Sequence, residues 1–147
     1  MRTREDVKEL AGQLDTTLKI LDDRYLIFDG ACALVAAIIA ARLEKERIPY
    51  KTVLYLHPDG QFGNIQKTVK DGNLCHVAID VLGQELGGEI DKQLMDEHGI
   101  KKGYTKMLDS KALMDLYTGV DNWNGEFDEK NTQEVVDEIE LCLDMCL

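Results

Sequence analysis

Three residues whose types can act together in acyl-transfer chemistry occur in the order Cys32, His76 and Asp91. Cys32 follows Gly30 at the start of an apolar segment, which predicts a thiol in the first turn of a buried helix. The unpaired N–H groups and the positive dipole end of such a helix favour the thiolate, which is the nucleophilic form. The backbone N–H of Cys32 would serve as an oxyanion donor, with the Tyr25 hydroxyl as a weak second candidate.

His76 lies near the start of the strongest predicted strand, residues 74–82, in which residues 76, 78 and 80 share one face. An imidazole at a strand end is well placed to take the proton of Cys32 and to return it to the leaving group. Asp91 ends the next predicted strand, and its carboxylate would orient the imidazole. Asp80 competes for this role, but it lies about 13 Å along the strand from His76. Asp91 is therefore preferred.

The elements that must position these residues follow from hydrophobic periodicity. A Thr3–Asp6 capping box opens a helix over residues 3–22, and a second helix over residues 31–47 is apolar on every side in its first half, which predicts burial. The remaining predictions are strands at 50–56, 74–82 and 85–90, a loop at 57–73, short turn or helical pieces at 92–98 and 109–118, a polar loop at 121–131, and a last helix at 132–147.

Strands that follow one another through short connections predict an antiparallel sheet. The predicted fold class is therefore α+β, with a central buried helix packed on a small antiparallel sheet and with additional N- and C-terminal helices. The length of 147 residues fits a single domain over residues 1–147.

The charge balance narrows the set of partners. There are 17 basic and 28 acidic residues, for a formal net charge of −11, so nucleic acid and anionic membranes are repelled. Lys101, Lys102 and Lys106 form too small a basic patch to change this expectation. An acidic face that docks on a basic protein is a minority interpretation. No apolar leader opens the chain and the longest apolar run is too short to cross a bilayer, so a reducing cytoplasm is expected.

Several other features have simpler interpretations than a site. Cys75 is predicted to point away from His76 into the core. Cys142 and Cys146 are four residues apart, but they align with apolar neighbours in the last helix, so core packing is favoured over a metal site. No cofactor is predicted, since the glycines of residues 83–88 do not lead from a strand into a helix. Trp123 belongs either to a lid or to an anchor for the last helix.

The ordered pattern resembles the core of the papain-like/transglutaminase-like superfamily. It comprises Gly30-Ala31-Cys32, an Ala-rich helix, the run from Cys75 to Val81, and Gly-Gly-Glu-Ile-Asp at 87–91. The resemblance covers roughly residues 29–92 and extends to small phage and bacterial proteins with the same order. It implies that Cys32 is the nucleophile, His76 the general base and Asp91 the orienting acid. The implied function is a cysteine-dependent hydrolase or acyl transferase (a peptidase, amidase, deamidase or transglutaminase-like enzyme) that acts on a protein, peptide or amide substrate.

The sequence departs from that family pattern at two kinds of position. No glutamine precedes Cys32 to complete an oxyanion hole, and Ala33 and Val77 stand where many transglutaminase-like proteins carry an aromatic residue. These departures keep a second hypothesis open, in which the chain is a non-catalytic acidic binding protein that uses the same fold to engage a host protein.

Overall fold

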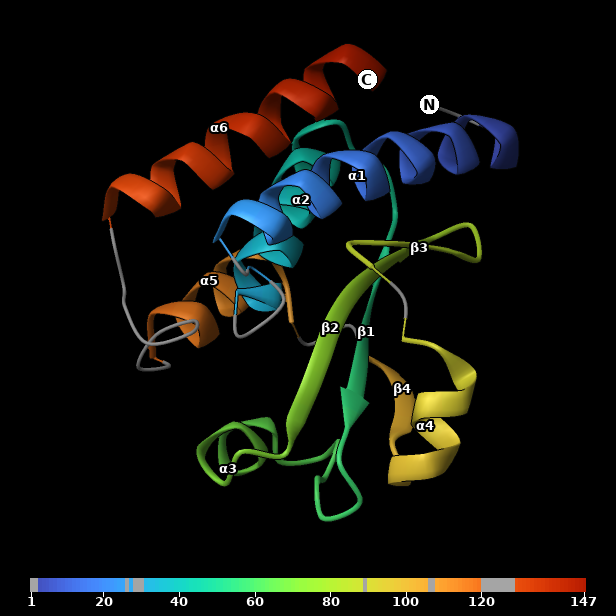
Figure 1. Ribbon diagram of the computed structural model, residues 1–147. Coiled ribbons are helices and arrows are strands. Elements are labelled where there is room, and N and C mark those ends of the chain that lie inside the picture. Colours follow the sequence, from blue (N-terminus) through green and yellow to red (C-terminus); the bar gives the residue numbers. More distant parts are fainter. Residues whose placement is uncertain (1–2, 26, 28–30, 89, 106–107, 120–128) are drawn as a thin grey trace.

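The computed structural model describes residues 3–25, 27, 31–88, 90–105, 108–119 and 129–147. These residues form an α+β fold with helices around one antiparallel sheet (Figure 1), as the sequence predicts. The helices are α1 (Arg4–Tyr25), α2 (Cys32–Lys45), α3 (Ile65–Lys70), α4 (Lys92–His98), α5 (Ser110–Gly119) and α6 (Glu129–Cys146). The strands are β1 (Lys51–Leu56), β2 (Leu74–Val81), β3 (Gln84–Leu86) and β4 (Lys101–Thr105).

The sheet has the strand order β3-β2-β1-β4, and every neighbouring pair is antiparallel. β1 and β2 pair directly from Lys51 opposite Asp80 to Tyr55 opposite His76. The next pair is Leu56 opposite Leu74, so β2 carries one extra residue, Cys75, at a bulge. The two central strands therefore keep strict alternation of faces only on the Asp80 side of this bulge.

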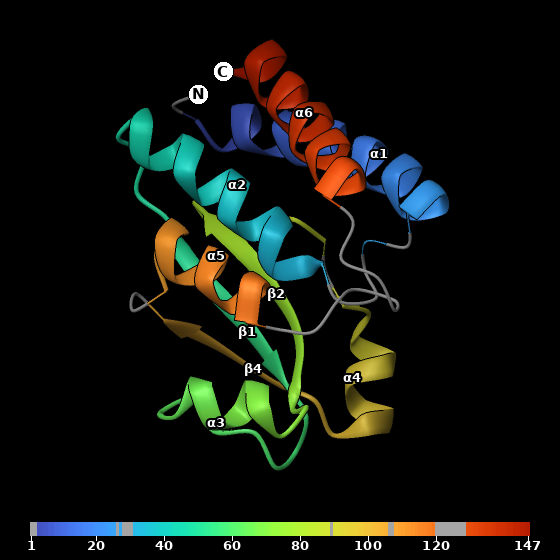
Figure 2. The same ribbon diagram turned by 90° about the vertical axis from the view of Figure 1, so that its left-hand side faces the viewer.

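α2 crosses one face of the sheet and is covered on its other sides by α5 and α6 (Figure 2). Its first nine residues, Cys32 to Ala40, are all buried, which matches the prediction that this segment is apolar on every side. Leu54, Leu56, Val77 and Ile79 of the sheet join it in the main core. A helix with no polar stripe is stable only when neighbours surround it, and this layer of helices supplies them.

α1 and α6 lie side by side over the helical layer in both views (Figures 1 and 2). The predicted capping box opens α1: the Thr3 N–H donates to Asp6 Oδ2 over 3.2 Å, and the Asp6 N–H donates to Thr3 Oγ1 over 3.1 Å. Val135, Ile139 and Cys142 of α6 are buried in the main core, which confirms core packing for this face of the last helix.

Some elements differ from the sequence prediction. The segment predicted as a loop at 57–73 contains α3, which Asn64 caps by accepting from Lys67 N. β4 was not predicted, because its run of two lysines and a glycine has no apolar alternation. β3 is shorter than the predicted strand at 85–90, since Gly87 and Gly88 take φ angles of 100° and 99° that end the extended conformation.

Two residues that the sequence analysis singles out, Trp123 and Lys106, lie outside the described residues. No helix in the described ranges is both long and apolar enough to cross a lipid bilayer.

The burial of α2 predicts the effect of truncating Ile39, which is fully buried. Ile39→Ala is expected to lower the free energy of unfolding by about 2–5 kcal/mol, because a cavity remains between α2 and the sheet. Urea denaturation measures this change. Ile20→Ala is the matched control, since Ile20 is exposed on α1, and its effect is expected within about 0.5 kcal/mol. Equal effects of the two substitutions would contradict the buried position of Ile39.

Candidate functional site

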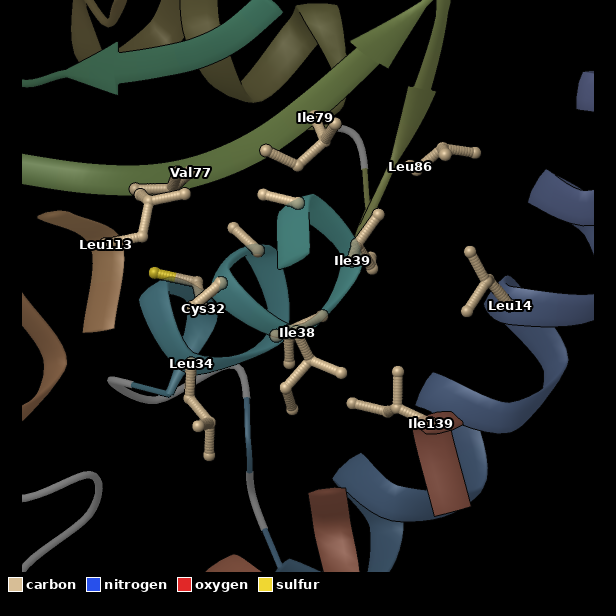
Figure 3. Packing of buried hydrophobic residues seen from close by; sticks show 14 of the residues in the cluster. Leu14, Cys32, Leu34, Ile38, Ile39, Val77, Ile79, Leu86, Leu113 and Ile139 are labelled. Atoms are coloured by element: carbon tan, nitrogen blue, oxygen red, sulfur yellow. The ribbon is translucent and has the colours of Figure 1, made fainter. Parts of the chain in front are cut away.

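Cys32 lies in the first turn of α2, as predicted, and is the first residue of that helix, but its thiol points into the core. Its exposed fraction is 8%, and Figure 3 shows the sulfur directed toward Val77 of β2 and Leu113 of α5. Burial raises the pKa of the Cys32 thiol above its ordinary value, and backbone hydrogen bonds at Val77, Ala33 and Cys32 itself oppose this rise without cancelling it. The thiol therefore stays protonated at neutral pH, in the less nucleophilic form.

His76 lies on the opposite face of the sheet from α2. Its partner across the ladder is Tyr55, and their ring centroids are 5.8 Å apart. Tyr55 belongs to a second apolar cluster with Val53 and Ala78, separate from the core that contains Cys32. Residues 76 and 77 of an extended strand project to opposite faces. The backbone of β2 therefore stands between the Cys32 thiol and the His76 ring, and the structure does not bring these two predicted partners together.

The bulge changes the position of Cys75. Strict alternation predicts that Cys75 points away from His76, but Cys75 packs against the second cluster, on the side of His76. This prediction is wrong because the extra residue of the bulge interrupts the alternation between Leu74 and His76. Cys75 is partly buried, and burial raises the pKa of its thiol.

The imidazole of His76 is held by a backbone carbonyl. Its Nε2 lies 3.0 Å from the Gly88 oxygen. A carbonyl only accepts, so Nε2 carries the proton in this hydrogen bond and Nδ1 is the basic nitrogen of the neutral ring. Burial lowers the pKa of His76, while the carbonyls of Gly88 and Gly87 and the negative charge of Glu85 raise it by less. The ring is therefore neutral at pH 7.

Gly87 and Gly88 bring that carbonyl to the histidine. Both have φ values in the left-handed region, which a side chain disfavours. A Cβ added at Gly87 would lie 3.6 Å from Ile39 Cδ1, so this turn also packs directly on α2. The two glycines thus lead the chain from β3 back along β2 to His76.

A polar cluster around the buried Glu85 adjoins His76 on this face. It consists of Tyr55, Glu85 and Lys102, from β1, β3 and β4. The Tyr55 hydroxyl donates to Glu85 Oε1, and Lys102 Nζ lies 2.7 Å from Glu85 Oε2. The Lys102 ammonium also lies 5.8 Å from the centroid of the Tyr55 ring and 5.6 Å from that of Tyr104. Each oxygen of the buried carboxylate therefore has a donor, which compensates for its loss of water.

A surface groove gives access to His76. Its volume is about 490 Å³, and it runs between the second half of α1 and the start of β2. Asp15, Leu18, Lys19 and Asp22 of α1 line it together with Cys75, His76, Gly88 and Ile90. Cys32 does not line this groove. The cysteine that lines it together with His76 is Cys75.

The remaining predicted residues have structural partners. Asp91 caps α4: its Oδ1 accepts from Gln93 N over 2.7 Å, and its side chain is exposed. A backbone carbonyl thus bonds the His76 ring where a carboxylate was predicted. The Tyr25 hydroxyl, the weak oxyanion candidate, donates to Glu134 of α6 and ties the end of α1 to that helix. Asp80 accepts from Gly83 N in the turn between β2 and β3.

Tyr55, Glu85 and Lys102 were not singled out from the sequence. One feature of the sequence could have indicated this cluster. Glu85 belongs to a predicted strand, and an acidic side chain that is buried in a short strand needs a partner. Its partners come from two other strands, and their register cannot be read from the chain. Within the described residues, no group of three or more His, Cys, Asp or Glu side chains is arranged to hold a metal ion.

Comparisons with known proteins add no relative. No family model matches the sequence, and searches of curated proteins and of solved structures return no match. The resemblance to papain-like and transglutaminase-like proteins therefore rests on the residue pattern alone.

The cluster around Glu85 predicts the effect of removing one hydroxyl. Tyr55→Phe keeps the ring but leaves Glu85 Oε1 without its donor, and it is expected to reduce the free energy of unfolding by about 1–3 kcal/mol. Urea denaturation at neutral pH measures the loss. Tyr104→Phe is the control, because it removes a hydroxyl that bonds Lys102 on the same face from a side chain that is 54% exposed, where water can replace the lost hydrogen bond. If both variants were equally mild, the buried hydrogen bond would contribute nothing to stability.

The neutral state of His76 predicts a pH dependence of stability. The unfolded chain takes up a proton near the ordinary imidazole pKa of about 6.5, whereas the folded protein resists it because burial lowers the pKa of His76. Stability is therefore expected to fall as the pH decreases through this range. Urea midpoints at about pH 7.5 and about pH 5.5 should differ more for the wild type than for His76→Gln, which cannot titrate. An equal difference for both proteins would show that His76 titrates alike in the folded and unfolded states.

Proposed function

We propose that the chain is a non-catalytic binding domain that engages a basic protein through its acidic surface. The observation that carries this proposal is the position of β2 between the Cys32 thiol and the His76 ring. A cysteine hydrolase needs its general base within hydrogen-bond reach of the nucleophile. Here the two side chains project from opposite faces of the sheet, so neither can act on the other without a rearrangement of β2.

The environment of Cys32 supports the same conclusion. The thiol is buried among apolar side chains of α2, β2 and α5, and burial raises its pKa. Reactive cysteines occupy electropositive and partly exposed surroundings, whereas buried cysteines pack as small apolar residues. Cys32 therefore fits a structural role at the contact between α2 and the sheet.

The charge of the chain supports a basic partner. A formal net charge of −11 produces a negative field that attracts cationic surfaces and accelerates their encounter. Leu141 and Met145 are exposed by 55% and 79% in α6, whose sequence holds six acidic residues and one lysine. Leu141 and Met145 lie one helical turn apart among these charges, and an apolar patch with a polar rim marks a protein-interaction surface.

A cysteine hydrolase or acyl transferase remains the second candidate, and one observation favours it. Cys32 lies at the first position of a 14-residue helix, and backbone N–H groups of Cys32, Ala33 and Val77 approach its sulfur and lower the thiol pKa against the effect of burial. These groups are the kind that stabilise a thiolate or an oxyanion. Catalysis on this arrangement would require His76 to reach the other side of β2.

Thiol labelling separates the two functions. With iodoacetamide and the native protein, Cys32 is expected to react more slowly than Cys75 and Cys146, which are partly exposed, and more slowly than glutathione at every pH between about 6 and 9. Peptide mass spectrometry gives the rate at each cysteine, and the unfolded protein, in which the four rates converge, is the control.

Fast labelling of Cys32 at pH 6 would instead support the enzyme. A basic partner should also bind the Cys32→Ala, His76→Gln double variant as tightly as it binds the wild type. Turnover of an amide substrate that this double variant loses would contradict the binding function.

A further inference from the structure

The side-by-side packing of α1 and α6 leaves a groove on the surface of the helical layer, with a volume of about 460 Å³. Leu10 of α1 and Cys142 of α6 are buried at its floor, and Leu141 and Met145 form an exposed apolar wall. The wall residues are four positions apart and lie on one face of α6. They give the α6 side of the groove an apolar patch about one helical turn long.

Acidic side chains border this apolar surface. Asp6 and Glu9 of α1 and Glu138 of α6 line the groove, and no lysine or arginine is among the lining residues that the structure describes. Apolar contact therefore comes together with three carboxylates in one groove. From Asp6 to Thr17 the lining part of α1 extends about 16 Å at about 1.5 Å per residue, the length of three helical turns.

Building on the proposed function, we infer that this groove binds an amphipathic helix of a partner protein, with leucine-like side chains on one face and lysine or arginine beside them. Helix-in-groove recognition uses apolar anchors spaced at three and four residues, which match the spacing of Leu141 and Met145. Methionine is adaptable in such surfaces because its unbranched side chain fits anchors of different shape. The bordering carboxylates select a cationic helix over a neutral one.

Charge excludes two other occupants. A second copy of this chain would bring Glu9 and Glu138 against an equally acidic surface, which costs binding energy. An anionic lipid surface is repelled in the same way. A cationic helix is the occupant whose charge and shape both fit.

A peptide of about 18 residues, with leucine at helical spacing and lysine elsewhere, serves as the probe. Fluorescence anisotropy measures its binding at about 0.15 M salt. The double variant Leu141→Ala, Met145→Ala, which leaves the charge unchanged, is expected to weaken binding about tenfold or more. Ile20→Ala removes an exposed apolar side chain that does not line the groove, and it should change binding less than about twofold. Circular dichroism and urea denaturation establish that both variants are folded.

Two further measurements locate the peptide. Cys146 lines the groove and Cys75 does not, so the bound peptide should slow iodoacetamide labelling of Cys146 several-fold and leave Cys75 unchanged. A peptide of the same composition in scrambled order keeps the charge but has no apolar face, and it should bind at least about tenfold more weakly.

The outcomes distinguish this inference from the broader function. If the Leu141→Ala, Met145→Ala variant binds like the wild type while Glu9→Gln, Glu138→Gln weakens binding, a basic partner binds elsewhere and only the groove assignment is wrong. If no cationic peptide binds any form of the protein, both proposals fail. A dimer in light scattering that the apolar double variant abolishes would assign the groove to a second copy and overturn the inference.

Discussion

The contact between α2 and β2 is the constraint on which the rest of the structure depends. The first nine residues of α2 form no polar stripe, so this part of the helix must be enclosed by the sheet, α5 and α6. Because the sheet helps to enclose α2, one face of each central strand carries apolar side chains, including Val77 and Ile79 of β2. The pleat of β2 then sends His76 to the other face. The same packing that buries Cys32 thus removes the histidine from it.

The opposite face of the sheet contains a buried carboxylate as well as apolar side chains. Its centre is apolar, with Val53 and Ala78, but Glu85 is almost fully buried beside it. A carboxylate in this position is tolerated because Tyr55 and Lys102 reach it from two other strands. Three strands are therefore linked by side chains as well as by their backbone ladders, and the position of β4 relative to β3 is defined across the whole width of the sheet.

The sequence predicts the parts of the fold that depend on local periodicity. The long helices, the burial of α2, the antiparallel central strands and the Thr3–Asp6 cap are found as predicted. β4 was missed because its residues show no apolar alternation, and a neighbouring strand, not its own sequence, stabilises it. The position of His76 relative to Cys32 could not be predicted from local periodicity either, because it depends on which face of β2 packs against α2. That choice is set by the register in which β2 pairs with β1.

The position of β4 at one end of the strand order has a consequence for self-association. An end strand has backbone N–H and C=O groups on its outer side that can pair with a strand from another molecule and so begin aggregation. β4 begins with Lys101 and Lys102, and their ammonium groups are tied to Gly60 and Glu85. Two adjacent positive charges held close to the strand make stacking of identical edges unfavourable. Lys102, which neutralises the buried Glu85, thereby also places a charge on the edge strand, where charged side chains disfavour pairing with another edge.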